Sequence, residues 1–538
     1  MFREYGANRQ STFMDATDWM DKRTLERLNK SWAPIFFSEV FSKIDESRFA
    51  PLYSNTGAPN FPVNVLLSLE YIKYMKGWVD QELLEAYNFD FLVNYAVGNR
   101  SIGEMPMAER TLYNFRSRVY QYSIDNPDSD DILFGQFQGL LHNFAEKSDI
   151  SMKEQRMDTT MFMSNIKKAG RLALAYDVLM SAVKAIPENM LTETLAEVML
   201  PKFKTDTLYR VKAADGEKKL DQIMGYCKEA SGILAGIPEA DEIAALVKRF
   251  LYEQSETDKE GRIRAKSKYV IRADSLQSAY DTDATYHRKA DVGQSGYVLE
   301  ISETCVADNP YQLVTDYRVE KNNVSDVEIL GDRIGGIHEN TGCEDMYVDG
   351  GFNSPGTADA AKKAEVELHF TNLSGSQPSK NIPVEEYKID EETNKILLCP
   401  AGNAPMRSDV TKDQTVARFE LDVCKSCEMR DACRVKLLKA EAVVRISIKT
   451  VDASRERVKM NTEKVENTSK RAGIEGSNSA LKRKGLKKLG VRGIAKSRVV
   501  SGLMVTVQNI KRFTKYMLGG YDAAIRKKIS RRLEVCPN

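Results

Sequence analysis

The sequence predicts a multidomain α+β protein. A chain of 538 residues is too long for one compact domain. The first 150 or so residues carry apolar side chains at helical spacing, whereas strand-like segments cluster later in the chain. The composition is 42% hydrophobic and 29% charged, which excludes global disorder and fibrous repeats. The net charge is only +1, so charge by itself predicts no polyanionic partner.

Residues 1–150 are predicted to form a helical N-terminal domain. Asp15–Phe41 has helical periodicity, and Pro62–Gly77 fits a helix that begins near a proline and ends at a glycine. Asp80–Tyr87 and Glu109–Tyr120 are shorter helical segments. An arginine-rich last helix is compatible with a DNA-binding helix-turn-helix domain, and the same pattern also fits a plain helical bundle.

The next part of the chain, residues 151–372, is predicted to be a sheet-containing domain. Its strand-like segments are Gln155–Met163, Ser295–Glu303, Tyr311–Glu320, Asp345–Asp349 and Val366–Thr371. The second and third segments are separated by a turn sequence and suit an antiparallel hairpin. A helical insert of about residues 171–265, which ends in the charged connection Glu256–Lys268, separates the first strand from the second.

The remainder of the chain is predicted to contain three parts. Residues 373–445, rich in Gly, Pro, Ser and Cys, form an insert. Residues 446–520 contain a helical segment from about Ser454 to Leu489 and a basic region, and residues 521–538 form a basic C-terminal tail. The polar start of the chain and its short apolar runs predict a cytoplasmic protein with no membrane partner.

Three acidic residues stand in positions that suggest catalysis. Asp158 lies within a strand, where a buried carboxylate needs a partner or a metal. Asp349 follows another strand and precedes two glycines, and Glu475 lies on the late helix. Arg471 and Lys482 share its helix face, although an exposed ion-pair face is the alternative. The order strand, strand end, helix suits phosphoryl transfer with two Mg²⁺ or Mn²⁺ ions.

Other titratable side chains compete for such roles. The competing acids are Asp274, Asp281, Asp283 and Glu344. Asp281 and Asp283 precede a strand, and a turn-capping role is preferred for both. The four histidines, His142, His287, His338 and His369, show no paired ligand spacing, so none is assigned to a metal.

Four cysteines have the spacing of a structural zinc site. Cys424 and Cys427 are separated by two residues, Cys433 follows six residues later, and Cys399 precedes the pair by 25 residues. A redox-active pair lacks thioredoxin-like surroundings, and an iron–sulfur cluster is a lesser option. The other cysteines are Cys227, Cys305, Cys343 and Cys536, for which packing or surface roles are expected.

A basic segment follows the late helix. Lys482–Arg498 holds eight cations and no acid. Such local asymmetry is typical of a phosphate-binding surface, and a solvated basic segment is the alternative. DNA contacts are predicted for Arg471, Lys482, Arg483, Lys484, Lys487, Lys488 and Arg492.

These motifs together resemble the bacterial insertion-sequence transposases of the DDE type. Arg471, Glu475 and Lys482 match the spacing of that family's Tyr-Arg-Glu-Lys signature, whereas its Tyr position holds Thr468. The blocks MDTTMFMSN around Asp158 and DGGFNSP at Asp349 resemble the family's two Asp segments. LCPAGN followed by CKSCEMRDAC resembles the cysteine insert of the insertion sequence 1182 type.

The resemblance implies an RNase H-like core, a mixed five-stranded sheet interrupted by the helical and cysteine-rich inserts. It implies a DNA transposase that binds terminal inverted repeats, cleaves there and joins 3′ ends to target DNA. Asp158, Asp349 and Glu475 would hold two Mg²⁺ ions, and synapsis of two ends implies a homodimer. The alternatives are an RNase H-like nuclease without strand transfer and a catalytically inactive zinc-containing DNA-binding protein.

Overall fold

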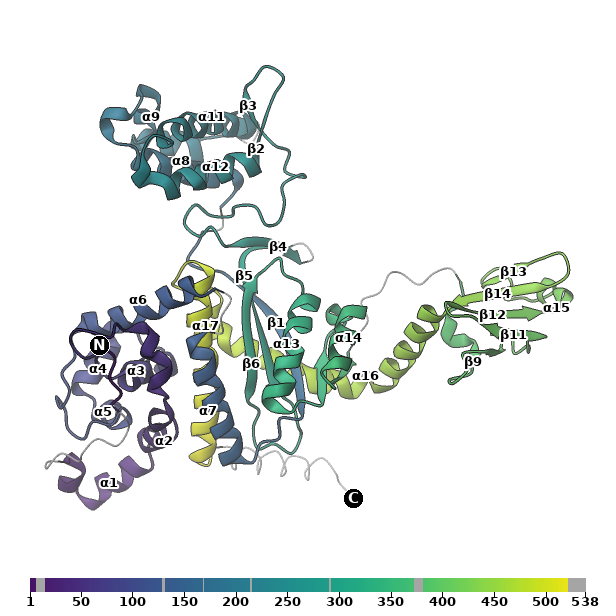
Figure 1. Ribbon diagram of the computed structural model, residues 1–538, viewed down its shortest axis with the longest axis horizontal. Coiled ribbons are helices and arrows are strands. Elements are labelled where there is room, and N and C mark those ends of the chain that lie inside the picture. Colours follow the sequence, from purple (N-terminus) through teal and green to yellow (C-terminus); the bar gives the residue numbers. More distant parts are fainter. Residues whose placement is uncertain are drawn as a thin grey trace. The chain divides into compact units, whose positions relative to one another are not determined.

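The computed structural model describes residues 1–5, 15–127, 131–167, 169–212, 215–289, 292–371 and 381–520. The chain divides into two compact units (Figure 1). Unit 1 comprises Met1–Ile329, Glu339–Gly342 and Ile474–Asn538, and unit 2 comprises Leu330–His338 and Cys343–Gly473. The predicted C-terminal tail, residues 521–538, lies outside the described residues.

The N-terminal region of unit 1 is helical, as predicted. Its helices are α1 (Lys22–Asn29), α2 (Trp32–Glu39), α3 (Val63–Lys76), α4 (Asp80–Phe89), α5 (Phe91–Ala96), α6 (Glu109–Asp125) and α7 (Ile132–Ser148), with short 3-10 turns η1 (Ala16–Trp19), η2 (Phe41–Lys43) and η3 (Glu46–Leu52). Asp21 and Ser31 accept backbone N–H bonds and start α1 and α2, which divides the helical stretch Asp15–Phe41. Helix α3 begins after Pro62 and ends at Gly77, as the sequence indicates.

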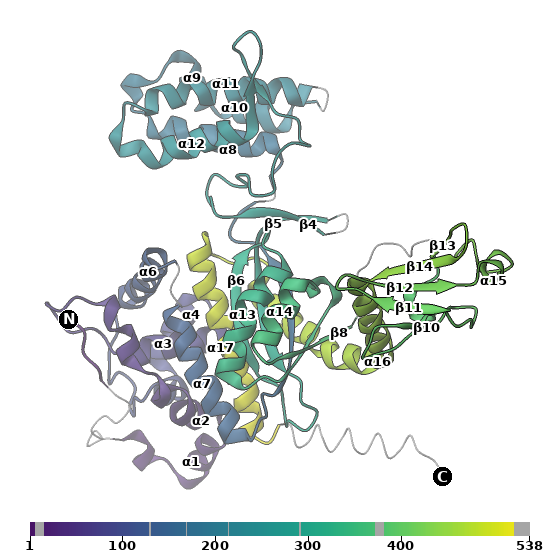
Figure 2. The ribbon, with the colours of Figure 1, turned by 45° about the vertical axis from the view of Figure 1, so that its right-hand side comes forward.

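Helix α17 (Ile494–Met517) is buried over most of its length and packs against α3, α6, α7 and β6. Figures 1 and 2 both show it beside α7. Phe513 stacks on Phe144 of α7 with ring centroids 4.4 Å apart. Asn509 Oδ1 accepts from the backbone N–H of Val314 in β6 at 2.9 Å, and Asn509 Nδ2 donates to Val314 O at 2.7 Å. The C-terminal helix and the N-terminal helices therefore share one hydrophobic core.

Four strands of unit 1 pair antiparallel around β5. They are β1 (Glu154–Phe162), β4 (Thr285–Lys289), β5 (Val292–Thr304) and β6 (Val314–Lys321). The second half of β5 lies between β1 and β6, and its first half forms a hairpin with β4. The predicted hairpin of the second and third strands is thus confirmed as β5 and β6. A Cβ at Gly296 in β5 would lie 2.2 Å from Phe162 O, so the end of β1 can approach only a glycine here.

Glu303 of β5 is a fully buried carboxylate held by two arginines. Arg156 of β1 binds its Oε1, and Arg512 of α17 binds its Oε2 at 2.8 Å. Ser477 of α16 donates to the same carboxylate and accepts from Arg512 at 2.6 Å. Burial raises the pKa of Glu303, but the two cations and the Ser477 bond outweigh burial and lower it. Ionised Glu303 therefore stabilises the folded state fully at pH values above the ordinary Glu pKa. This contribution to the free energy of unfolding is lost as pH falls through the lowered pKa of Glu303.

The helical insert has its own hydrophobic core. It contains α8 (Arg171–Ala185), α9 (Glu193–Val198), α10 (Pro201–Lys204), α11 (Gly216–Leu234) and α12 (Asp241–Gln254), with the single turns η4 (Glu188–Met190), η5 (Thr205–Tyr209) and η7 (Pro238–Ala240). The charged connection after it is a hairpin of β2 (Ser255–Thr257) and β3 (Ile263–Ala265) rather than an open linker. Asp258 accepts backbone bonds from Glu260 and Arg262 and closes that turn.

In unit 2, β7 (Asp345–Val348) and β8 (Glu367–Phe370) form the predicted fourth and fifth strands and pair parallel. Helix α13 (Asp326–Thr341) precedes them, and η8 (Gly350–Phe352) and α14 (Pro355–Lys363) connect them. Helix α16 (Ile448–Leu481) contacts β7 where Lys470 Nζ donates to Tyr347 Oη at 2.8 Å. The helix predicted to end near Leu489 ends earlier, at the turn η10 (Lys482–Leu486), because Gly485 takes φ 110°.

The cysteine-rich part of unit 2 contains strands that the sequence did not predict. They are β9 (Lys388–Ile389), β10 (Ile396–Leu398), β11 (Arg407–Val410), β12 (Gln414–Phe419), β13 (Val435–Leu437) and β14 (Ala442–Ser447), with η9 (Val384–Glu386) and α15 (Leu421–Lys425). Figure 2 shows the small sheet in the order β11-β12-β14-β13. Antiparallel and parallel strand pairs accompany many helices, so the fold is mixed α+β, as predicted.

We expect Glu303→Gln to destabilise unit 1 strongly. The variant leaves the buried Arg156 and the partly buried Arg512 without their anion, which costs about 3–5 kcal/mol. Hydrogen exchange should accelerate in peptides from β1 and β5 and stay unchanged in peptides from β12 and β14. Asp206→Ala, which removes an exposed ion pair with Arg210, is the control and should change stability by less than about 1 kcal/mol. Unchanged exchange in β1 would contradict this role of Glu303.

Candidate active site

Asp158 lies in the middle of β1, opposite Ile301 of β5, and is half-buried. Its Oδ2 accepts a hydrogen bond from Asn478 Nδ2 of α16 at 3.0 Å. Because side chains alternate along a strand, Asp158 shares its face of β1 with Arg156, which binds Glu303. The ion pairs and hydrogen bonds of Glu303 with Arg156, Arg512 and Ser477, here called the Glu303 network, therefore hold α16 against the strand face that carries Asp158.

One face of α16 carries the predicted Arg-Glu-Lys group. Arg471, Glu475, Asn478 and Lys482 recur at helical spacing, and Ile474 and Leu481 beside them are fully buried. Glu475 is exposed and lies one turn before the Asn478 amide that binds Asp158. Within unit 1, the helix face of Glu475 and the strand face of Asp158 are thus brought together.

Asp349 directly follows β7 in unit 2. Its Oδ1 accepts the backbone N–H of Gly351 at 2.8 Å, so the carboxylate caps the turn η8. Its Oδ2 lies 3.6 Å from a terminal nitrogen of Arg471. Arg471 is therefore paired with the second predicted acid, and its predicted contact with DNA stays a prediction.

The competing acids have structural partners. Asp281 is buried and accepts hydrogen bonds from Ser164, Tyr297 and the backbone of Gly493. Asp283 accepts from the backbone N–H of Ile494 at 3.2 Å. Both acids cap backbone, as predicted, but the element they cap is the start of α17.

Of the two remaining competing acids, Asp274 is half-buried and Glu344 is exposed. Asp274 pairs with Arg272 at 2.8 Å on the surface. Glu344 directly precedes β7, and its backbone oxygen accepts from the N–H of Glu367 at 2.8 Å.

Several polar residues around the site were missed by the sequence analysis. Ser477 and Asn478 stand beside Glu475 on α16, and Glu303 stands in the second predicted strand. The sequence pattern around these residues is weak evidence for a role in the site, because the sequence does not distinguish buried polar residues from exposed ones before the packing is known. Asn478 does lie seven residues after Arg471, which places it on the same helix face.

The four predicted zinc cysteines line one pocket in unit 2. Burial raises the pKa of the Cys424 thiol, and the neighbouring Cys399, Cys433 and Cys427 raise it further. Tyr387 Oη lies 3.2 Å from Cys433 Sγ. The four cysteines therefore line the same pocket, although no three of their sulfur atoms all lie within 4.8 Å of one another. A bound cation would reverse the direction of the pKa shift.

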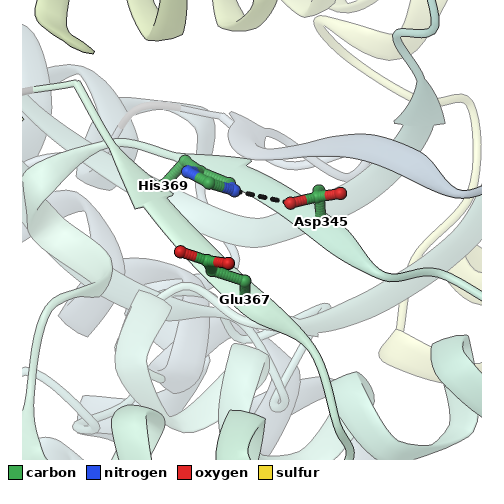
Figure 3. Close-up of side chains that lie close together, drawn as sticks. All are labelled: Asp345, Glu367 and His369. Carbon is green, nitrogen blue, oxygen red and sulfur yellow. Dashed lines mark hydrogen bonds and ion pairs between the residues drawn. The ribbon is translucent and has the colours of Figure 1, made fainter.

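A second group of ligand-type side chains lies on β7 and β8 (Figure 3). Donor atoms of Asp345, Glu367 and His369 lie within 4.8 Å of one another, the only such group of three in the described parts of the chain. His369 Nε2 is 2.7 Å from Asp345 Oδ1, and its ring stacks on Tyr347 at 4.6 Å. The hydrogen bond to Asp345 and the stacking on Tyr347 account for the position of His369.

The predicted phosphate-binding segment is anchored beside the end of β1. The backbone N–H of Met163 donates to Lys487 O at 3.2 Å, and Met163 O accepts from the N–H of Leu489 at 2.8 Å. Arg492 Nε donates to Asn165 O at 3.0 Å. The exposed side chains of this segment are Lys482, Arg483, Lys484, Lys487, Lys488 and Arg492. Lys484 reaches solvent but is partly desolvated by its neighbours. This desolvation and the nearby cations Lys511, Arg512 and Arg483 lower its pKa to about 8.

No helix in the described residues is long and apolar enough to cross a membrane. Comparison with protein families gives two matches. Residues 398–514 match the transposase DDE domain, and residues 23–118 match a transposase domain, DUF772. The first match includes the four cysteines and Glu475, whereas Asp158 and Asp349 lie outside it. No curated protein and no solved structure matches the chain. Both family matches indicate a DNA transposase.

The lowered pKa of Lys484 predicts a pH-dependent affinity for duplex DNA. Lys484 loses its charge as pH rises through about 8, so one cation–phosphate contact should weaken between pH 7 and pH 9. Lys484→Arg keeps the charge and should reduce this dependence, whereas Lys484→Ala should bind more weakly, with a salt slope shallower by about one. Fluorescence-anisotropy titrations on one duplex measure both effects.

Lys488→Arg makes the same replacement elsewhere in the basic segment and is the matched control. It should retain the pH dependence of the unmodified chain. An equal pH dependence in Lys484→Arg and the unmodified protein would assign the effect to another group.

Proposed function

We propose that this DNA transposase binds the terminal inverted repeats of its own mobile element, cleaves the DNA there and joins the freed 3′ ends to target DNA. Asp158, Asp349 and Glu475 would form the catalytic group. Such an enzyme acts on DNA in the bacterial cytoplasm, and pairing two element ends requires a homodimer.

The observation that carries this proposal is the set of contacts along one face of α16. Arg471 pairs with Asp349, and Asn478 binds Asp158. Glu475 lies between these two positions on the helix. The contact of Arg471 lies within unit 2 and that of Asn478 within unit 1, and each contact supports a role for the acid that it binds.

The strand pairing supports an RNase H-like core. Such a core needs three antiparallel strands, with the first acid on strand one, followed by a parallel pair with the second acid after strand four. Strands β1, β5 and β6 pair antiparallel and β1 carries Asp158, whereas β7 and β8 pair parallel and Asp349 follows β7. The order along the chain agrees with this assignment.

The donor atoms fit Mg²⁺ or Mn²⁺. All three acids offer carboxylate oxygens, the ligand that hard divalent cations prefer. A buried amide oxygen of Asn478, beside Asp158, has no hydrogen-bond partner in the described part of the chain. When bound, two such ions supply charge stabilisation at the attacking and leaving oxygens of phosphoryl transfer. Arg471 would keep Asp349 oriented, and the Glu303 network would keep α16 in register with β1.

Two surfaces of unit 1 suit DNA. The basic segment after α16 presents exposed cations to phosphates. In the N-terminal region, Leu112 and Phe115 of α6 face the core, whereas Arg110, Asn114 and Gln121 are exposed. This face has the side chains that read base edges in a major groove, which supports a helix-turn-helix-like role for α6.

The cysteine cluster suits a structural Zn²⁺ ion. Four thiolates can close a tetrahedral site with no open position for catalysis. The surrounding part of the chain has short strands and a small core, so a metal would contribute much of its stability. We therefore assign the cluster to folding rather than to phosphoryl transfer.

Glu475→Gln should abolish cleavage while sparing DNA binding. The substitution keeps the shape of the side chain but removes the charge that would hold a cation, which should lower the cleavage rate by at least about 100-fold. The substrate is a duplex with the repeats that flank the coding region, and the assay follows cleavage and joining with Mg²⁺. Joined products separate a transposase from a nuclease without strand transfer.

Lys482→Ala, on the same helix face, is the matched control for Glu475→Gln. It should weaken binding and flatten the salt dependence by about one unit of slope, with little loss of cleavage at saturating protein. Full cleavage by Glu475→Gln would overturn the assignment of Glu475.

Purified protein should contain one zinc ion per chain, measured by elemental analysis. Cys427→Ser should lose the zinc and accelerate hydrogen exchange in β12 and β14, because the metal links the segments around that sheet. Cys343→Ser, which alters a buried cysteine outside the cluster, should keep the zinc. Zinc-free protein with four freely modifiable thiols would contradict the assignment.

A further inference from the structure

Asn478 lies beside Asp158 within unit 1, and its two polar side-chain atoms have different surroundings. Its Nδ2 donates to Asp158 Oδ2 at 3.0 Å. The residue is only 6% exposed. Its Oδ1 is buried and has no hydrogen-bond partner among the described residues. A buried acceptor left without a partner loses its hydration without a replacement and destabilises the fold, so this oxygen needs a ligand.

The charge of Asp158 determines which way the amide faces. An ionised carboxylate only accepts hydrogen bonds, so the NH₂ end of Asn478 must face Asp158. The carbonyl end then stays close to the same carboxylate, because both polar atoms belong to one short amide group. Asn478 Oδ1 is therefore a neighbour of the Asp158 carboxylate and has no hydrogen-bond partner among the described residues.

The backbone around Asn478 is held rigidly. Ser477, the preceding residue, donates to the buried carboxylate of Glu303 and accepts from Arg512. Leu481, one turn later, is fully buried. A side chain on such a fixed turn can present an oxygen with little further loss of conformational freedom.

We propose that Asn478 serves the divalent-cation site of Asp158 in two ways: its Nδ2 orients the carboxylate, and its Oδ1 donates an oxygen to the same cation, directly or through one water. This inference rests on the proposed function, in which Asp158 holds a cation. Amide carbonyl oxygens are ordinary ligands of hard divalent cations. Glu475, three residues earlier on the same helix face, would contribute its carboxylate from the adjacent turn.

The test is Mn²⁺ affinity of the full-length protein, measured from free Mn²⁺ by electron paramagnetic resonance. Asn478→Leu removes both polar atoms and should weaken binding by about 10–100-fold. Asn478→Asp keeps an oxygen and loses the donor, so its affinity should stay within about tenfold of the unmodified protein. Asn478→Ala replaces the leucine variant if the latter does not fold, as judged by thermal unfolding.

Asn467→Leu is the matched control, since Asn467 is also buried on α16 but donates to the backbone of Phe370 at 3.4 Å. It should bind Mn²⁺ like the unmodified protein. Asp158→Asn should abolish the same Mn²⁺ binding that Asn478→Leu weakens.

Each other outcome overturns a defined statement. Unchanged affinity in Asn478→Leu, with loss in Asp158→Asn, overturns the role of Asn478 and leaves the proposed function intact. Equal losses in Asn478→Leu and Asn478→Asp overturn the oxygen-donor role and keep only the orienting bond. Unchanged affinity in Asp158→Asn overturns the proposed cation site itself.

Discussion

The arrangement of unit 1 depends on the buried carboxylate of Glu303. A carboxylate without water is stable only when cations and hydrogen bonds replace its hydration. Arg156, Arg512 and Ser477 supply that replacement from β1, α17 and α16. Because a buried charge cannot tolerate a missing partner, these elements keep one register relative to β5. That register puts the polar face of α16 against Asp158.

The same constraint explains why the last helix belongs to the core. Helix α17 carries Arg512 to Glu303, and its apolar side chains fill the space between the N-terminal helices and β6. Asp281 and Asp283 fix its beginning, directly after the exposed basic segment. The cations of that segment are consequently anchored beside the end of β1. Under the proposed function, this anchor would help them to position a DNA backbone.

Polar groups with different degrees of burial have different roles in this protein. Glu303, Asp281 and Ser477 are buried and satisfied, so they determine how the elements pack. Asp158 and Asp349 are only partly covered, and Glu475 is exposed. Under the proposed function, Asp158 and Asp349, each held by a neighbouring side chain, would meet cations without rearrangement, as preorganised electrostatic catalysis requires.

The sequence by itself determined the local features. Periodicity and short-range spacing, which are properties of neighbouring residues, predict four features. These are the helical N-terminal region, the five core strands, the cysteine spacing and the helix face of Arg471, Glu475 and Lys482. The short strands around the cysteines were missed because two to six residues carry too little periodicity. Only the tertiary structure decided that Asn478 meets Asp158, 320 positions away, and that Arg471 pairs with Asp349. The reason is physical: which polar groups are buried, and what satisfies them, depends on the distant segment that packs over them.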